Sequence, residues 1–223
     1  MGRFSERTTS FMEPIFTIEY SEYCVAEELS KLLYIPKQFN PSIFVPTSRQ
    51  EKGIDLILYR RDDEACRNFT TTIQVKSSRI WRMDDKTAAK NNNCEFALWY
   101  SKFIPSPRAD FFILTAQYPY LSNNDHIAQG KRSSPKANIH WKSLFLVFTQ
   151  QEMKHFLSRI KNKSGNTDHW FGIVFNNPKE IYTQRGFYKE NGDFLFEPLD
   201  QYILSRKNPH AIQKLQKSLM PSS

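Results

Sequence analysis

The sequence predicts a mixed α/β fold in which a central sheet of four or five strands lies between two helices. Apolar side chains recur at helical spacing in residues 18–34 and again in residues 150–163. Short apolar or alternating segments, which are typical of strands, lie between these two helices. The order of helix, strands, helix and strand fits a sheet that carries one helix on each face.

The first helix is predicted from an apolar stripe within residues 18–34. The stripe consists of Val25, Ala26, Leu29, Leu32 and Leu33. Prolines follow closely, so residues 35–52 are expected to be extended or irregular. Residues 1–17 are expected to form an N-terminal arm.

An antiparallel hairpin is predicted after this irregular segment. Its first strand is the short apolar segment GIDLILYR at 53–60, and its second is FTTTIQVKSS at 69–78. A polar turn or loop joins the two strands. Because the side chains of a strand alternate between its faces, Gln74 and Lys76 are expected on one face and Val75 on the other.

The remaining chain predicts further strands, loops and a last helix. The strands are expected at 94–103, 109–120, 143–149 and 170–175. The strongly polar segment 82–93 and the Asn- and Ser-rich segment 121–138 are expected to be exposed loops. A second hairpin, with an Asn-Gly turn, is expected at 187–198, and a final helix at 209–219.

Composition and charge set broad limits on the function. Lys and Arg number 31 against 23 Asp and Glu, a net charge of +8 that favours a polyanionic partner, although many basic proteins bind no nucleic acid. Cys24, Cys66 and Cys94 stand far apart without a C-x-x-C pair, which predicts reduced thiols rather than a zinc site or disulfides. Without a membrane-length apolar run or a signal peptide, the sequence predicts a soluble, cytoplasmic protein.

The segments GID at 53–55 and QVK at 74–76 combine the groups needed to cut a phosphodiester. That reaction needs a divalent cation to hold the phosphate and acidify a water, and a nearby positive charge to offset the charge that develops. Asp55 and Gln74 offer oxygen ligands of the kind that Mg²⁺ prefers. Lys76 lies two residues after Gln74 and therefore points to the same face of its strand. Pairing of the two strands is expected to bring the three side chains together.

The motif GID…QVK resembles that of the PD-(D/E)xK nuclease superfamily, in its variant with Gln at the second acidic position. It is most similar to Mrr-type restriction nucleases and archaeal Holliday-junction resolvases, and the similarity covers about residues 18–117. The order of a helix, an apolar strand with Asp and a β-rich strand with QVK supports the resemblance. It implies a restriction-endonuclease-like fold, with a mixed central sheet flanked by helices and a C-terminal hairpin and helix as an extension.

The resemblance implies one more acidic residue, a Glu on the first helix. The candidates are Glu19, Glu22, Glu27 and Glu28. Helical geometry places Glu22 in the middle of the apolar stripe, where a carboxylate is costly unless it has a partner such as a metal site. Glu22 is therefore preferred, with Glu28 as the reserve. A position on an exposed first helical turn is the ordinary alternative for Glu22.

The resemblance also implies a role for each residue of the site. Asp55 ligates the cation directly, Gln74 contributes its amide oxygen, and the Val75 carbonyl adds a further ligand. Glu22 acts through a metal-bound water, and Lys76 orients or helps to deprotonate the attacking water. The implied cofactor is Mg²⁺, with Mn²⁺ as a substitute. Gln74 replaces a carboxylate by a neutral ligand, which weakens metal binding.

Ordinary structural roles are the alternatives for these residues. Asp55 can be a strand-entry residue after a glycine turn, and Gln74 and Lys76 can belong to a solvated strand face. Basic residues beyond the motif are candidates for contacts with DNA phosphates, with an ordinary exposed surface as their alternative. These candidates are Arg79, Lys131, Arg132 and Lys136.

The function predicted from the sequence is Mg²⁺-dependent hydrolysis of DNA phosphodiester bonds by a restriction-type or DNA-processing endonuclease. The core is expected at 18–175, and the extension at 176–223 is expected to add DNA contacts or a dimer surface. Double-stranded or branched DNA is the expected substrate and a homodimer the expected assembly. Two alternatives stay open: a Holliday-junction resolvase or transposon-end nuclease of the same fold, and a nuclease-like domain that binds DNA or protein without cutting.

Overall fold

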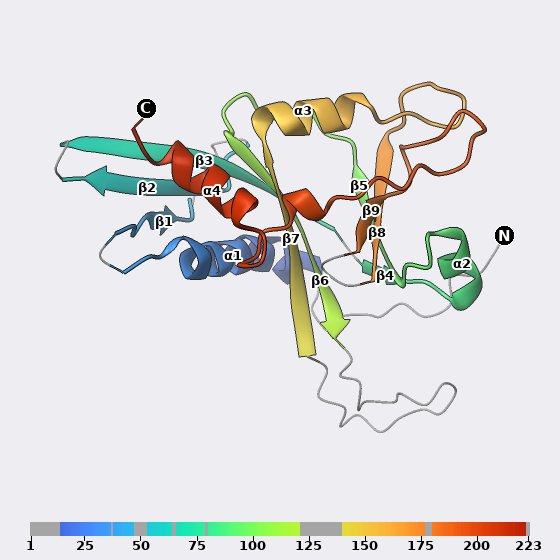
Figure 1. Cartoon of the computed structure of the whole chain (residues 1–223), viewed down its shortest axis with the longest axis horizontal. Coiled ribbons are helices and arrows are strands. Elements are labelled where there is room, and N and C mark those ends of the chain that lie inside the picture. The colour runs from blue at the N-terminus through green and yellow to red at the C-terminus, as the bar shows by residue number, and fades with distance from the viewer. Residues whose placement is uncertain are drawn as a thin grey trace.

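A computed structural model describes residues 14–36, 38–46, 53–63, 66–78, 80–120, 140–176 and 180–221. Within these residues the chain forms a five-stranded mixed sheet and a four-stranded antiparallel sheet (Figure 1). The first sheet has the order β1 (Ser42–Phe44), β2 (Leu56–Asp62), β3 (Arg67–Ser77), β6 (Phe111–Tyr120) and β7 (His140–Thr149). The second has the order β4 (Ile80–Arg82), β5 (Phe96–Ser101), β8 (Trp170–Phe175) and β9 (Ile181–Thr183). The helices are α1 (Pro14–Leu33), α2 (Asp85–Lys90), α3 (Gln150–Ser158) and α4 (Pro209–Ser218), with a 3-10 turn η1 (Asp200–Tyr202).

The first sheet contains the predicted hairpin. Strands β2 and β3 pair antiparallel, with Leu56 opposite Ile73 at the end of the ladder. Strand β3 then pairs parallel with β6, which requires a long crossover between them. This crossover contains β4, α2 and β5, so the chain leaves the first sheet, starts the second one and returns.

Alternation along the strands creates two apolar layers, one on each face of the first sheet. Ile73 and Val75 of β3 pack in the same buried cluster as Val25 and Leu29 of α1. On the opposite face, Phe112 and Leu114 of β6 pack with Met153 and Phe156 of α3 and with Phe171 and Ile173 of β8. Helices therefore cover both faces of the mixed sheet, as predicted from the sequence.

Several predicted elements need correction. Segment 82–93 is not simply a loop, because it contains α2, whose first turn is capped where Asp84 accepts the Thr87 N–H at 2.7 Å. The strands predicted at 94–103 and 170–175 pair with each other as β5 and β8, outside the central sheet. Sequence patterns identify such strands but not the distant strand that each one joins.

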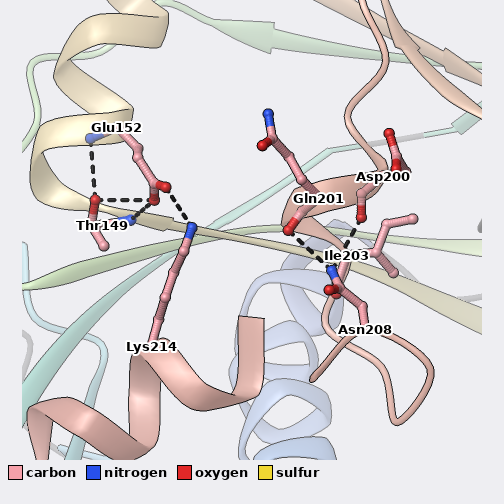
Figure 2. Close-up of polar contacts among 7 residues, drawn as sticks. All are labelled: Thr149, Glu152, Asp200, Gln201, Ile203, Asn208 and Lys214. Carbon is pink, nitrogen blue, oxygen red and sulfur yellow. Dashed lines mark hydrogen bonds and ion pairs between the residues drawn. The ribbon is translucent and has the colours of Figure 1, made fainter. Parts of the chain in front are cut away.

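The C-terminal segment packs into both layers of the fold. Leu215 and Leu219 join the cluster under α1, and the Leu204 N–H donates to the Phe145 carbonyl at 2.9 Å, which covers part of the β7 edge. Figure 2 shows Lys214 of α4 reaching Glu152, the residue whose carboxylate completes the capping box of α3 with Thr149.

The loop before α4 is held by one side chain. The amide of Asn208 donates to the carbonyls of Asp200, Gln201 and Ile203, at 3.1, 3.0 and 2.8 Å (Figure 2). These bonds fix the path from η1 to α4. None of the helices in the described part of the chain is both long and apolar enough to span a membrane.

Candidate active site

The candidate site lies at the start of β2, where β2 first pairs with β3. Strand β2 begins at Leu56, opposite Ile73, so the residues of β3 that follow Ile73 have no β2 residue opposite them. Asp55, the residue before β2, continues the backbone pairing with β3. Its N–H donates to the Ile73 carbonyl at 2.8 Å, and its carboxylate Oδ2 accepts the Val75 N–H at 2.7 Å. The Asp55 side chain is thereby fixed against the exposed end of the ladder.

The backbone of Val75 adds a second oxygen to this position. The N–H and C=O of a residue in an antiparallel pair point to the same side of the strand. Because the Val75 N–H points to Asp55, its carbonyl also faces the side that β2 leaves open. The carboxylate and the carbonyl thus belong to one small region.

Gln74 supplies a buried oxygen that lacks a partner. The residue is only 8% exposed, and within the described part of the chain its Oε1 atom has no hydrogen-bond partner. Leaving a buried acceptor unsatisfied costs about 1–3 kcal/mol, so native structures rarely do it without a reason. A bound cation is one way to satisfy such an oxygen.

Gly53 holds the turn that leads into Asp55. Its φ is +89°, and a Cβ atom here would lie 2.5 Å from Ser106 Cβ and 3.4 Å from Gln74 Nε2. Only glycine combines this backbone conformation with so close an approach. The first residue of the GID motif therefore packs between Gln74 and the loop that precedes β6.

Lys76 occupies the same face of β3 as Gln74, two residues further along. Its Nζ lies 5.3 Å from the ring centroid of Phe103, a favourable cation–π arrangement. Phe103 in turn packs against Phe112 of β6, with ring centroids 6.0 Å apart. The ammonium is thus positioned by an aromatic surface rather than by an ion pair with a described residue.

Glu22, the predicted fourth member, comes from a different layer. It lies partly exposed on α1, and that helix packs against the Ile73 and Val75 face of the sheet. Gln74 and Lys76 point to the opposite face. The structure therefore joins Asp55 to the QVK segment through Val75, whereas Glu22 is carried by the helix that covers the other face of β3. The reserve residue, Glu28, lies on the same helix and lines a surface hollow that also includes Gln117 and Ser143.

The donor set contains few negative charges. The described residues include no group of three or more His, Cys, Asp or Glu side chains that could hold a metal ion. A cation here would rely on the Asp55 carboxylate and on the neutral oxygens of Gln74 and Val75. All three are oxygen donors, so the set fits a hard cation such as Mg²⁺.

The basic residues predicted to contact DNA lie outside the described residues. They are Arg79, Lys131, Arg132 and Lys136.

The loop at 102–108 was not singled out from the sequence, although it supplies Phe103 under Lys76 and Ser106 against Gly53. Its two prolines in KFIPSPR were the available signal of a rigid connection.

Comparisons with known proteins add no assignment. No family model, no curated protein and no solved structure matches this chain. The resemblance therefore rests on the GID…QVK motif and on the order of the elements that carry it.

Proposed function

We propose that the protein is a metal-dependent DNA endonuclease with a restriction-endonuclease-like core, of a restriction or DNA-processing type. The observation that carries the proposal is the hydrogen bond that joins the Asp55 carboxylate to Val75 at the open end of the β2–β3 ladder, next to Gln74, whose buried oxygen has no hydrogen-bond partner among the described residues. Lys76 on the same face completes the pattern. The net charge of +8 suits a polyanionic substrate.

The proposed chemistry assigns a role to each of these residues. Asp55, Gln74 and the Val75 carbonyl would hold a Mg²⁺ ion, which when bound supplies charge neutralisation at the phosphate and a more acidic water. The hydrogen bond from the Val75 N–H keeps the Asp55 carboxylate in place. Lys76 would orient the attacking water and offset the negative charge that develops on the phosphate oxygens.

One observation favours the alternative in which the domain binds DNA without cutting it. Gln74 is neutral, so Asp55 is the only carboxylate in the predicted ligand set at this end of β3. A site with one carboxylate holds a divalent cation weakly. Cleavage of four-way junctions but not of plain duplex would instead favour the resolvase alternative.

Cleavage assays with matched variants test the proposal. Supercoiled plasmid, genomic DNA and a four-way junction are incubated with the protein and Mg²⁺, Mn²⁺ or EDTA. Asp55→Asn keeps an oxygen that can accept the Val75 N–H but removes the charge. Asp63→Asn is the matched control, because Asp63 lies exposed in the hairpin turn beside Arg61. We expect metal-dependent cleavage that Asp55→Asn abolishes and Asp63→Asn retains. Intact DNA on all three substrates would reject the endonuclease proposal.

A further inference from the structure

The loop at residues 102–108 carries the most exposed large apolar side chain described in this chain. Ile104 is 93% exposed, whereas the other exposed large hydrophobic residues range from 36% to 59%. Single exposed apolar residues are common on protein surfaces, so exposure alone decides nothing. The contacts of the neighbouring residues and the position of the loop beside the candidate site point to a role for Ile104.

The loop is held rigidly on both sides of Ile104. Phe103 packs against the buried cluster around Phe112 on one side, and Pro105 is half-buried on the other. The Lys102 N–H donates to the His169 carbonyl at 2.8 Å. With both neighbours anchored, the Ile104 side chain is held outward.

The far half of the loop is fixed by a single side-chain amide. Nε2 of Gln150, at the start of α3, donates to the carbonyls of Ser106, Pro107 and Ala109, at 3.3, 3.1 and 3.0 Å. The Thr72 hydroxyl donates to the Arg108 carbonyl at 2.6 Å. In Figure 1 this connection runs from β5 to the start of β6, past the first turn of α3.

This rigid loop borders the candidate site. Phe103 lies under the Lys76 ammonium, and Ser106 packs against Gly53. The loop also carries Lys102 and Arg108, while the carboxylate of Asp110, which follows the loop, accepts the Thr72 N–H at 2.9 Å. An apolar projection flanked by positive charges suits a nucleic acid, whose phosphates are negative and whose stacked bases are apolar.

We propose that Ile104 inserts between bases of the bound DNA and unstacks them beside Lys76, so that the loop 102–108 is a positioning element for the substrate. This inference rests on the proposed function for its substrate class. Proteins that deform DNA often use such apolar wedges, and the cost of unstacking is offset by the additional contacts that the bent DNA makes.

Binding in EDTA tests the inference without any need for cleavage. The probes are a fluorescein-labelled duplex and a four-way junction that carry 2-aminopurine, whose fluorescence rises when the base is unstacked. The variants are Ile104→Ala, Ile104→Phe and, as the matched control, Tyr34→Ala. Tyr34 is an exposed apolar residue that directly follows the last residue of α1, on the helix layer behind the sheet.

We expect Ile104→Ala to weaken binding about tenfold or more, because alanine buries three fewer apolar carbons between the bases, and to abolish the 2-aminopurine signal. Ile104→Phe should restore both, and Tyr34→Ala should bind like the unaltered protein. Because an apolar contact releases no counterions, the ratio of the two affinities should stay constant between about 50 and 200 mM salt.

Two outcomes would overturn the inference: equal affinity and equal fluorescence for Ile104→Ala and the unaltered protein, or a lack of DNA binding by the unaltered protein. An Ile104 effect on binding without any metal-dependent cleavage would uphold the wedge while rejecting the endonuclease. Metal-dependent cleavage without any effect of Ile104→Ala on DNA binding would reject the wedge and uphold the endonuclease.

Discussion

Gln74 illustrates how much depends on one residue at this site. Its side chain is buried, yet its amide oxygen has no hydrogen-bond partner in the described structure. A carboxylate at this position would add a negative charge to a set of donors that otherwise has only Asp55. Sequence alone predicted the pairing of these residues through the hairpin, because alternation and strand pairing are local rules. The burial of Gln74 and the missing partner of its oxygen arise from tertiary packing, in which Gly53 lies close to Gln74 and Ser106, and were visible only in the structure.

Replacement of Gln74 by Glu should strengthen metal binding. The variant adds a charged oxygen to the donor set without a large change in volume, so we expect Mn²⁺ and Mg²⁺ affinity to rise about tenfold or more. Calorimetric titration without DNA measures this affinity. Gln213→Glu, at an exposed position on α4, is the control. Unchanged metal affinity in Gln74→Glu would argue against a cation at this position.

Gly53 should be far less replaceable than other glycines with positive φ. Gly53→Ala combines backbone strain with a contact of 2.5 Å to Ser106, so we expect a loss of roughly 2–3 kcal/mol in unfolding free energy. Gly192 also has a positive φ, +82°, but a Cβ there would meet nothing within 4 Å. Urea unfolding of Gly53→Ala and Gly192→Ala separates the two effects. Equal losses of unfolding free energy in the two variants would contradict a destabilising contact between a Cβ at position 53 and Ser106.

At the scale of elements, local sequence patterns predicted most helices and strands, but they did not predict which distant strands pair. The helix at α1, the β2–β3 hairpin, α3 and α4 follow from periodicity and turn residues that lie close together in the chain. The partner of β5 is β8, which lies far along the sequence, and apolar runs such as FALWYS carry no sign of it. The N-cap at Asp84 was also missed, because α2 is short and has no buried residues.

The contact between α3 and α4 should make stability depend on pH. Burial by itself raises the pKa of Glu152, but hydrogen bonds from Lys214 and from the Thr149 N–H outweigh it and lower that pKa below its usual value. A lowered folded-state pKa stabilises the protein above the unfolded-state pKa, about 4.3 for Glu, and this contribution is lost as the pH falls through the folded-state value.

Lys214→Met removes the partner and should cost about 1 kcal/mol at pH 7, since the pair is only partly buried. The difference from the unaltered protein should shrink at about pH 3, where Glu152 is increasingly protonated in both proteins. Urea unfolding at the two pH values measures it, with Lys217→Met on the same helix as the exposed control. A difference that is the same at both pH values would contradict the assignment to Glu152.

At the scale of the whole molecule, the second sheet helps to build the candidate site. The crossover between β3 and β6 runs through β4, α2 and β5, and its return segment is the loop 102–108 that borders Gly53 and Lys76. The two sheets share one buried cluster, in which β5 and β8 pack with β6, β7 and α3. A stable second sheet therefore fixes the loop that positions Lys76. The sequence predicted both halves of the motif but not this contribution, which arises from tertiary packing.

Cleavage by Lys76→Met is the most direct measurement of the central claim. Methionine keeps an apolar side chain that can pack against Phe103 but removes the charge proposed to act on the phosphate. With Mg²⁺, we expect plasmid cleavage to fall by about 100-fold or more, while DNA binding and Mn²⁺ affinity stay within about twofold of the unaltered protein. Cleavage by Lys76→Met at the rate of the unaltered protein would contradict the proposed active site.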